Sequence, residues 1–202
     1  MKKVISMVLV LVLSVCLSVP ALALENQNES TAKAEVVDGD IVITVSTQEE
    51  ADQVVAQIRA DNVRAQQLWE EAQKRAKVLD NLERTYVDSY ASTTTYVTSV
   101  EALRQFGLRF ITLTFEALYT KTTNVAGATV FGSVKSISAY AKNSADNVTV
   151  LSKNYTLIDS ARTIAANYSL RVKVYNSSDG TSNTYSRQYY VEFYISGRGR
   201  VY

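Results

Sequence analysis

The spacing of apolar side chains changes twice along the chain, and the longest regular stretch has a helical period. From residue 47 to residue 84, apolar or small residues recur every three or four positions, with no Gly or Pro between them. This period is typical of one face of an amphipathic α-helix. The pattern therefore predicts a single long helix over residues 47–84. The defining positions of its apolar face, here called the helix seam, are Val55, Ile58, Asn62, Trp69 and Leu79.

The start of this helix carries its own signal. Thr47 is followed three residues later by Glu50, and this spacing is that of a capping box. We expect the Thr47 hydroxyl to accept a hydrogen bond from the Glu50 amide, while the Glu50 carboxylate reaches back to the start of the helix. Acidic residues in the first turn also favour the positive end of the helix dipole.

Asn62 is the one polar residue in the seam, and it leaves alternatives open. In a coiled coil, a polar residue at such a position fixes register and oligomer number. The helix would then bind a second copy of the chain. We favour the other possibility, in which the helix packs on its own sheet and Asn62 faces water or a backbone group. A break at Asp61 and Asn62 would instead give two helices in a hairpin.

The segment before the helix predicts a polar leader followed by a β-hairpin, together covering residues 24–46. Two short apolar runs, Ala34–Val37 and Ile41–Val45, flank Asp38-Gly39-Asp40. Residues of this kind suit the positive φ angles of a tight hairpin turn.

From residue 85 onward the pattern becomes that of strands. All 13 Tyr lie here, among many Thr, Ser and Val, and polar turns such as 177–180 separate the runs. Such spacing is typical of an antiparallel sandwich. The chain is thus expected to have an α+β fold, with an antiparallel β-sandwich-like domain over residues 85–202. Residues 99–106 could instead form a short helix. The expected strands are 86–100, one centred on 109–117, 128–142, 148–158, 163–175 and 185–196.

The first 23 residues predict export. Lys2 and Lys3 precede an apolar run, and Ala21 and Ala23 supply the small residues of a cleavage site. The run is shorter than the roughly 20 residues that a transmembrane helix needs, so no membrane anchor is expected in the mature chain. We therefore expect a secreted protein, extracellular or associated with the cell surface.

Cleavage after Ala23 would leave a chain without Cys, His, Met or Pro. This composition excludes a disulfide framework, Cys/His metal clusters and nucleophiles that depend on Cys or His. No cofactor and no metal site are expected. Charge is divided unevenly: residues 24–84 carry 7 basic and 13 acidic side chains, whereas residues 85–202 carry 12 and 7. The halves thus have net charges of −6 and +5.

Two candidate sites remain. Glu116 and Glu192 lie inside strand patterns, and a pair of carboxylates across a cleft could hydrolyse glycosidic bonds. The second candidate is a surface rich in Tyr and Arg, residue types suited to binding sugars, anionic polymers or carboxylates. Its members are Arg187, Tyr189, Tyr190, Tyr194, Arg198 and Arg200.

The favoured interpretation is a secreted, non-enzymatic interaction protein that uses this Tyr/Arg surface. Its partner would be an extracellular glycan, an anionic wall polymer or a protein. Nucleic acid is not expected, because the basic residues are spread along the strands and form no run. A homo-oligomer through the helix stays possible. The alternative is a secreted, carboxylate-dependent hydrolase that acts on polysaccharide.

Overall fold

The computed structural model describes residues 32–82, 96–106, 109–124, 126–141, 148–196 and 199–202. For residues 78–82, 96–106 and 109–110 it describes the backbone only. The expected signal sequence, the leader up to residue 31 and the first part of the expected strand 86–100 lie outside this part of the chain.

Helix α2 (Gln48–Leu82) is continuous over 35 residues. Its start is capped as the sequence predicts: the Glu50 amide donates to Thr47 Oγ1 at 3.1 Å. The Glu50 carboxylate reaches back to the Ser46 amide at 2.8 Å. The helix runs through Asp61 and Asn62 without a break, and both side chains bond residues of the sheet. The helical-hairpin alternative is therefore wrong.

One sheet, here called sheet A, is built around the long central strand β7. Strand β8 pairs with β7 along its whole length and occupies one edge of the sheet. On the other side of β7, β6 pairs with its first half and β2 with its second half. Strand β1 continues the sheet beyond β2. The five strands are β1 (Lys33–Val37), β2 (Asp40–Val45), β6 (Val150–Ile158), β7 (Thr163–Asn176) and β8 (Thr181–Tyr194).

Three antiparallel strands form the second sheet, sheet B, in the order β3-β4-β5. They are β3 (Tyr96–Phe106), β4 (Arg109–Thr123) and β5 (Thr129–Ala141). The backbone of β3 is extended throughout, so the short helix considered for residues 99–106 does not form.

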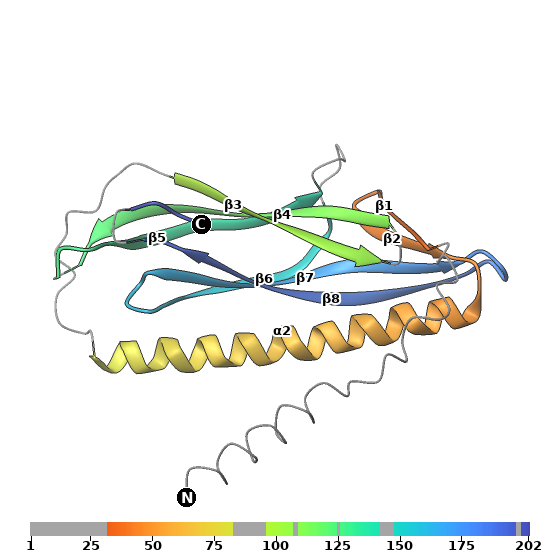
Figure 1. Ribbon diagram of the computed structural model, residues 1–202, viewed down its shortest axis with the longest axis horizontal. Helices are drawn as coiled ribbons and strands as arrows, with labels where there is room; N and C mark the ends of the chain where they lie inside the picture. The colour runs from red at the N-terminus through yellow and green to blue at the C-terminus, as the bar shows by residue number, and fades with distance from the viewer. Residues whose placement is uncertain (1–31, 83–95, 107–108, 125, 142–147, 197–198) are drawn as a thin grey trace, which may run out of the picture. The chain divides into compact units, whose positions relative to one another are not determined.

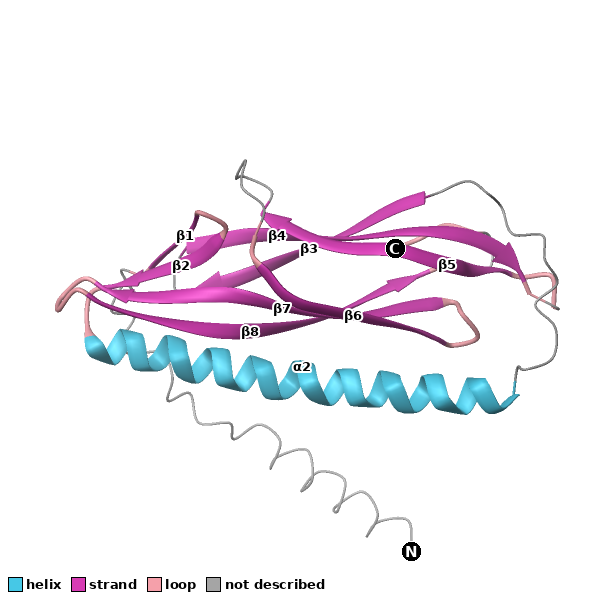
Figure 2. Ribbon diagram, turned by 180° about the vertical axis from the view of Figure 1, so that it is seen from behind, coloured by secondary structure: helices cyan, strands magenta, loops and turns pink. Residues whose placement is uncertain are grey.

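The two sheets enclose the main apolar core. Alternate residues of β4 point towards sheet A, and Phe115 lies with its ring 4.8 Å from that of Tyr168 on β7. Helix α2 lies against the strands of sheet A, and sheet B lies on the far side of sheet A from the helix (Figures 1 and 2). A smaller core of Ala72, Ile158 and Ala165 joins the helix to sheet A.

The expected α+β fold, with an N-terminal hairpin, one helix and a sandwich-like arrangement of strands, is confirmed. One pairing differs from a purely antiparallel domain. Strand β2 runs parallel to β7, with Ile41 opposite Val172 and Val45 opposite Asn176. Through this pairing the N-terminal hairpin is part of sheet A. Its apolar residues belong to the same core.

Candidate functional site: the groove between α2 and β8

The helix seam is occupied by the chain's own sheet. Ile58 is 1 % exposed and belongs to the main core, and Ala72 is completely buried against β6 and β7. Trp69 is half-buried beside Ala72, and Val55 is half-buried against the main core. The side chain of Leu79 lies outside the described residues. Of the two packing alternatives, the structure has the one in which the seam faces the sheet of the same chain.

Asn62 bonds backbone groups, the second of the two environments expected for it on a packed helix, and these groups belong to the free edge of β8. Its Nδ2 donates to the backbone oxygen of Ser186 at 2.8 Å, and its Oδ1 accepts from the backbone amide of Gln188 at 2.7 Å. These two backbone groups point away from β7. The Asn62 side chain thus takes the place that a neighbouring strand would otherwise occupy.

Strand alternation places Arg187 and Tyr189 on the inner face of β8. Tyr189 is 1 % exposed and its ring centre lies 5.5 Å from that of Phe115 on sheet B. Arg187 is 3 % exposed, and its guanidinium carbon lies 5.2 Å from the centre of the Tyr189 ring. The guanidinium group forms an ion pair with Asp61 of α2. This pair ties the helix to the edge strand beside Asn62.

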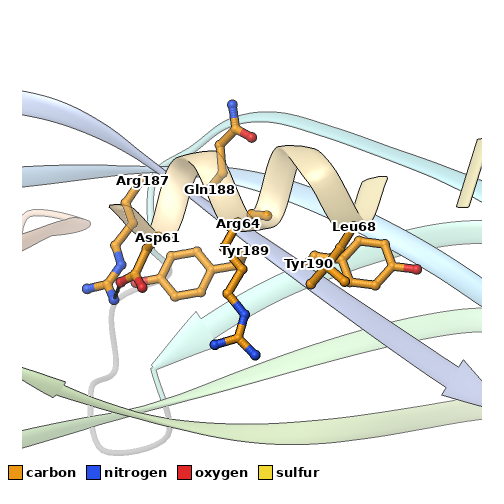
Figure 3. A pocket seen from close by; sticks show the side chains of 8 residues that line it. Asp61, Arg64, Leu68, Arg187, Gln188, Tyr189 and Tyr190 are labelled. Carbon is orange, nitrogen blue, oxygen red and sulfur yellow. Dashed lines mark hydrogen bonds and ion pairs between the residues drawn. The ribbon is translucent and has the colours of Figure 1, made fainter. Parts of the chain in front are cut away.

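A groove of about 260 Å³ opens where α2 passes the edge of β8. Figure 3 shows the Arg187–Asp61 pair at one end, Tyr190 at the other, and Arg64 between them. Arg64 is exposed, and no carboxylate of the described residues pairs with it. The full lining consists of Asp61, Arg64, Ala65 and Leu68 from the helix and of Arg187, Gln188, Tyr189 and Tyr190 from the strand.

A second set of polar contacts involves Tyr190, at one end of the groove. The Tyr190 hydroxyl donates to Glu192 Oε1 at 2.5 Å, and Arg75 Nη1 donates to the same oxygen at 3.3 Å. Burial raises the pKa of Tyr190, and the hydrogen bond to Glu192 raises it further. Arg75 also pairs with Asp159, and this hydrogen bond holds the pKa of Asp159 below its usual value. Tyr190 therefore stays neutral, and the Glu192 carboxylate is paired with Arg75.

The predicted Tyr/Arg residues do not form one exposed surface. Arg187 and Tyr189 are buried, because odd-numbered residues of β8 face the core, although both still line the groove beside Tyr190. Tyr194 is 41 % exposed and lies away from the groove, at the end of β8, where its hydroxyl accepts a hydrogen bond from Arg162. Arg200 is exposed near the C-terminus. Arg198 lies outside the described residues.

Nor does the structure bring the two candidate carboxylates together. Glu116 alternates with the core residues of β4, so its side chain points away from sheet A, where it accepts a hydrogen bond from Tyr140 at 2.8 Å. Glu192 lies on the helix side of sheet A, bound to Arg75. The two groups belong to different sheets and point in opposite directions.

The sequence interpretation missed the helix half of the site. Asp61, Arg64 and Leu68 were not predicted as binding residues, although they recur at helical spacing beside the seam. That spacing is the signal that could have found them. In the part of the chain that the structure describes, no three His, Cys, Asp or Glu side chains gather as metal ligands. No helix among these residues combines the length and apolarity needed to cross a membrane.

Comparison with protein-family models, with curated proteins and with solved structures gives no match to this chain.

Proposed function

We propose that this chain is an exported, non-enzymatic interaction protein whose binding site is the groove between α2 and β8. The observation that carries the proposal is the convergence of three predicted binding residues on the groove: Arg187, Tyr189 and Tyr190 line it together with Arg64. Arg and Tyr are enriched in binding sites, because both combine apolar area with directed hydrogen bonds.

The size of the groove favours a large partner over a small molecule. Pockets for small molecules usually enclose about 300–1,000 Å³, and this groove holds about 260 Å³. That volume suits one or two side chains or sugar units of a larger partner. Most of the partner would then lie outside the groove.

Charge favours an anionic ligand group. Two guanidinium groups against one carboxylate leave the lining with a net charge of +1. Since Asp61 already pairs with Arg187, the unpaired cation of the lining is Arg64, which is exposed to an incoming ligand. No specific observation favours the alternative hydrolase, because Glu116 and Glu192 are each engaged by other side chains.

The test is a binding assay with three classes of probe: an acidic extended peptide, a neutral oligosaccharide and a poly(glycerol phosphate) chain. We expect saturable binding of at least one probe by the protein without residues 1–23. Arg64→Glu should weaken that binding at least about ten-fold, which corresponds to about 1.4 kcal/mol.

Arg59→Glu is the matched control. It makes the same charge change on an exposed position of the same helix, but Arg59 does not line the groove. Binding that is lost equally in both variants, or binding by none of the three probes, would contradict the proposal.

A further inference from the structure

We infer that the groove binds an extended acidic peptide segment of another protein, which adds as a strand to the free edge of β8. This inference rests on the proposed function and names the class of partner for the same site. It follows from the backbone of β8, whose free edge is covered at two points and left open between them.

The direction of each backbone group on β8 follows from two observed contacts. The Ser186 oxygen and the Gln188 amide point away from β7, because both bond Asn62. In a strand, every second residue directs its N–H and C=O to the same side. Tyr190 and Glu192 therefore also direct their backbone groups away from β7, towards the outer side of sheet A.

The stretch from Tyr190 to Glu192 is flanked by covered residues on both sides. Asn62 covers residues 186 and 188. On the other side, the Tyr194 amide donates to the Tyr202 oxygen at 3.1 Å, and the Tyr202 amide donates back at 2.9 Å. Within the described residues, no group bonds the outward N–H and C=O of Tyr190 and Glu192. In the same part of the chain, the outward backbone groups of Ser182 and Thr184 are also unbonded, but these residues do not line the groove.

An open pair of residues between two caps differs from an unprotected edge. Edge strands are usually shielded over their whole length, because unpaired backbone groups attract other chains. Here the open segment starts at Tyr190, which also lines the groove. A peptide that pairs with this segment would direct alternate side chains into the groove between α2 and the sheet, as in known strand-addition complexes.

The groove wall indicates which side chains such a peptide carries. Arg64 supplies the unpaired cation, so an acidic residue is favoured opposite it. Leu68, which is 37 % exposed, supplies an apolar neighbour one helical turn further on. A peptide that alternates β-branched residues around one Glu fits both features and the strand geometry.

A second copy of this chain fits less well. Two β8 strands would have to align their open residues, because Asn62 and Tyr202 cover the edge on both sides of those residues in each copy, whereas a free peptide has no covered residues of its own. A sugar polymer fits less well for another reason: its hydroxyl groups can donate and accept, but they do not repeat as the alternating N–H and C=O groups of a strand do.

The experiment uses fluorescein-labelled Thr-Val-Thr-Glu-Thr-Val-Thr and the protein without residues 1–23. Two N-methylated versions carry methyl groups on alternate amides, one version on each edge of the extended peptide. Because only one edge of the peptide can face β8, one version should lose binding at least ten-fold and the other should bind like the parent. Methylation favours an extended backbone in both versions, so each is the control for the other.

The charge is tested with the same peptide carrying Lys in place of Glu, which should bind at least ten-fold more weakly. Arg64→Glu should reverse this preference, and Arg59→Glu should leave it unchanged. Equal effects of the two methylation patterns would overturn strand addition, and equal binding of the Lys peptide would overturn the acidic preference.

The remaining outcomes separate this inference from the proposed function. If only the oligosaccharide or the poly(glycerol phosphate) probe binds, and Arg64→Glu abolishes that binding, the groove is the binding site but its ligand is not a peptide. A concentration-dependent dimer in sedimentation that Arg64→Glu dissociates would assign the edge to a second copy. If no probe binds, both proposals fail.

Discussion

Asn62 and Gln188 are joined by a hydrogen bond in which the Gln188 backbone amide donates to the side-chain oxygen Oδ1 of Asn62 at 2.7 Å. The Nδ2 group of the same Asn62 side chain donates to the backbone oxygen of Ser186, two residues earlier in the strand. One amide side chain thus supplies both the acceptor and the donor that a neighbouring strand would offer. This contact fixes where α2 crosses the edge of β8 and where the open part of that edge begins.

Replacement of Asn62 tests this arrangement. Asn62→Leu removes both hydrogen bonds and should lower the free energy of unfolding by about 1–3 kcal/mol, the sum of two ordinary bonds. Urea denaturation measures the change. Gln67→Leu, an equally apolar change at an exposed position of α2, should have little effect. A stability equal to or above that of the wild type would show that Asn62 does not hold β8.

Trp69 reports on the packing of the helix, because it is the only Trp in the chain. It lies half-buried between α2 and sheet A of the same chain. Its fluorescence should therefore be blue-shifted to the same extent at every protein concentration. Trp69→Ala should cost about 1–3 kcal/mol, less than the 3–5 kcal/mol of a fully buried Trp. Emission that moves to the red on dilution would mean that a second chain covers the seam.

The buried Asp40 carboxylate should make the folded protein less stable in acid. Its side chain is 5 % exposed and accepts a hydrogen bond from Lys173 at 2.8 Å, which holds the pKa of Asp40 below its usual value. The pKa of an Asp side chain in an unfolded chain is about 3.9. Because the folded pKa is lower, the contribution of Asp40 is complete above that pH and is lost as the pH falls below it.

Asp40→Asn should therefore lower stability by about 1–2 kcal/mol at pH 7 and make less difference at pH 2–3. Thermal unfolding at several pH values measures this. Asp38→Asn, in the same turn but exposed, serves as the control. An equal loss for Asp40→Asn at pH 7 and pH 2 would contradict the assignment.

The turn between β6 and β7 contains three successive non-glycine residues with positive φ: Asp159 at 55°, Ser160 at 57° and Ala161 at 59°. Residues with a Cβ are strained in this region, whereas Gly is not. Ala161→Gly should raise the free energy of unfolding by about 0.5–1 kcal/mol, after the added chain entropy is subtracted.

Ala60→Gly provides the opposite control for this change. It lies at an exposed helical position and should lower stability by about 1 kcal/mol. Calorimetry distinguishes the two directions. If both Gly variants are destabilised alike, the turn does not hold Ala161 in the left-handed region.

Export gives a prediction on covalent structure. Lys2, Lys3 and the Ala21-Leu22-Ala23 segment predict cleavage after Ala23, or after Ala21. Mass spectrometry of the protein recovered outside the cell should show a chain that begins at Leu24 or Leu22. Replacement of Ala21 and Ala23 by Arg should block processing. A released chain that retains Met1 would contradict this prediction.

Features that depend on neighbouring residues were readable from the sequence alone. The period of α2, its capping by Thr47 and Glu50, and the turn over residues 177–180 all arise from local backbone geometry. The turn closes as expected, with Gly180 at a φ of 73° and its amide donating to the Asn176 oxygen at 2.9 Å. Local hydrogen bonds and side-chain period decide such elements before any tertiary contact forms.

The site required the tertiary structure, because its parts are more than a hundred residues apart in the chain. The sequence suggested Arg187 and Tyr189 for binding but placed them on an exposed surface, since residue type does not reveal which face of a strand points inward. It also offered two roles for Asn62, neither of which specified β8. Only the packing of α2 across sheet A placed Asn62 at the free edge and Arg64 beside Tyr190. The side-chain period of a helix or strand determines which residues share a face, whereas long-range packing determines which part of the protein that face contacts.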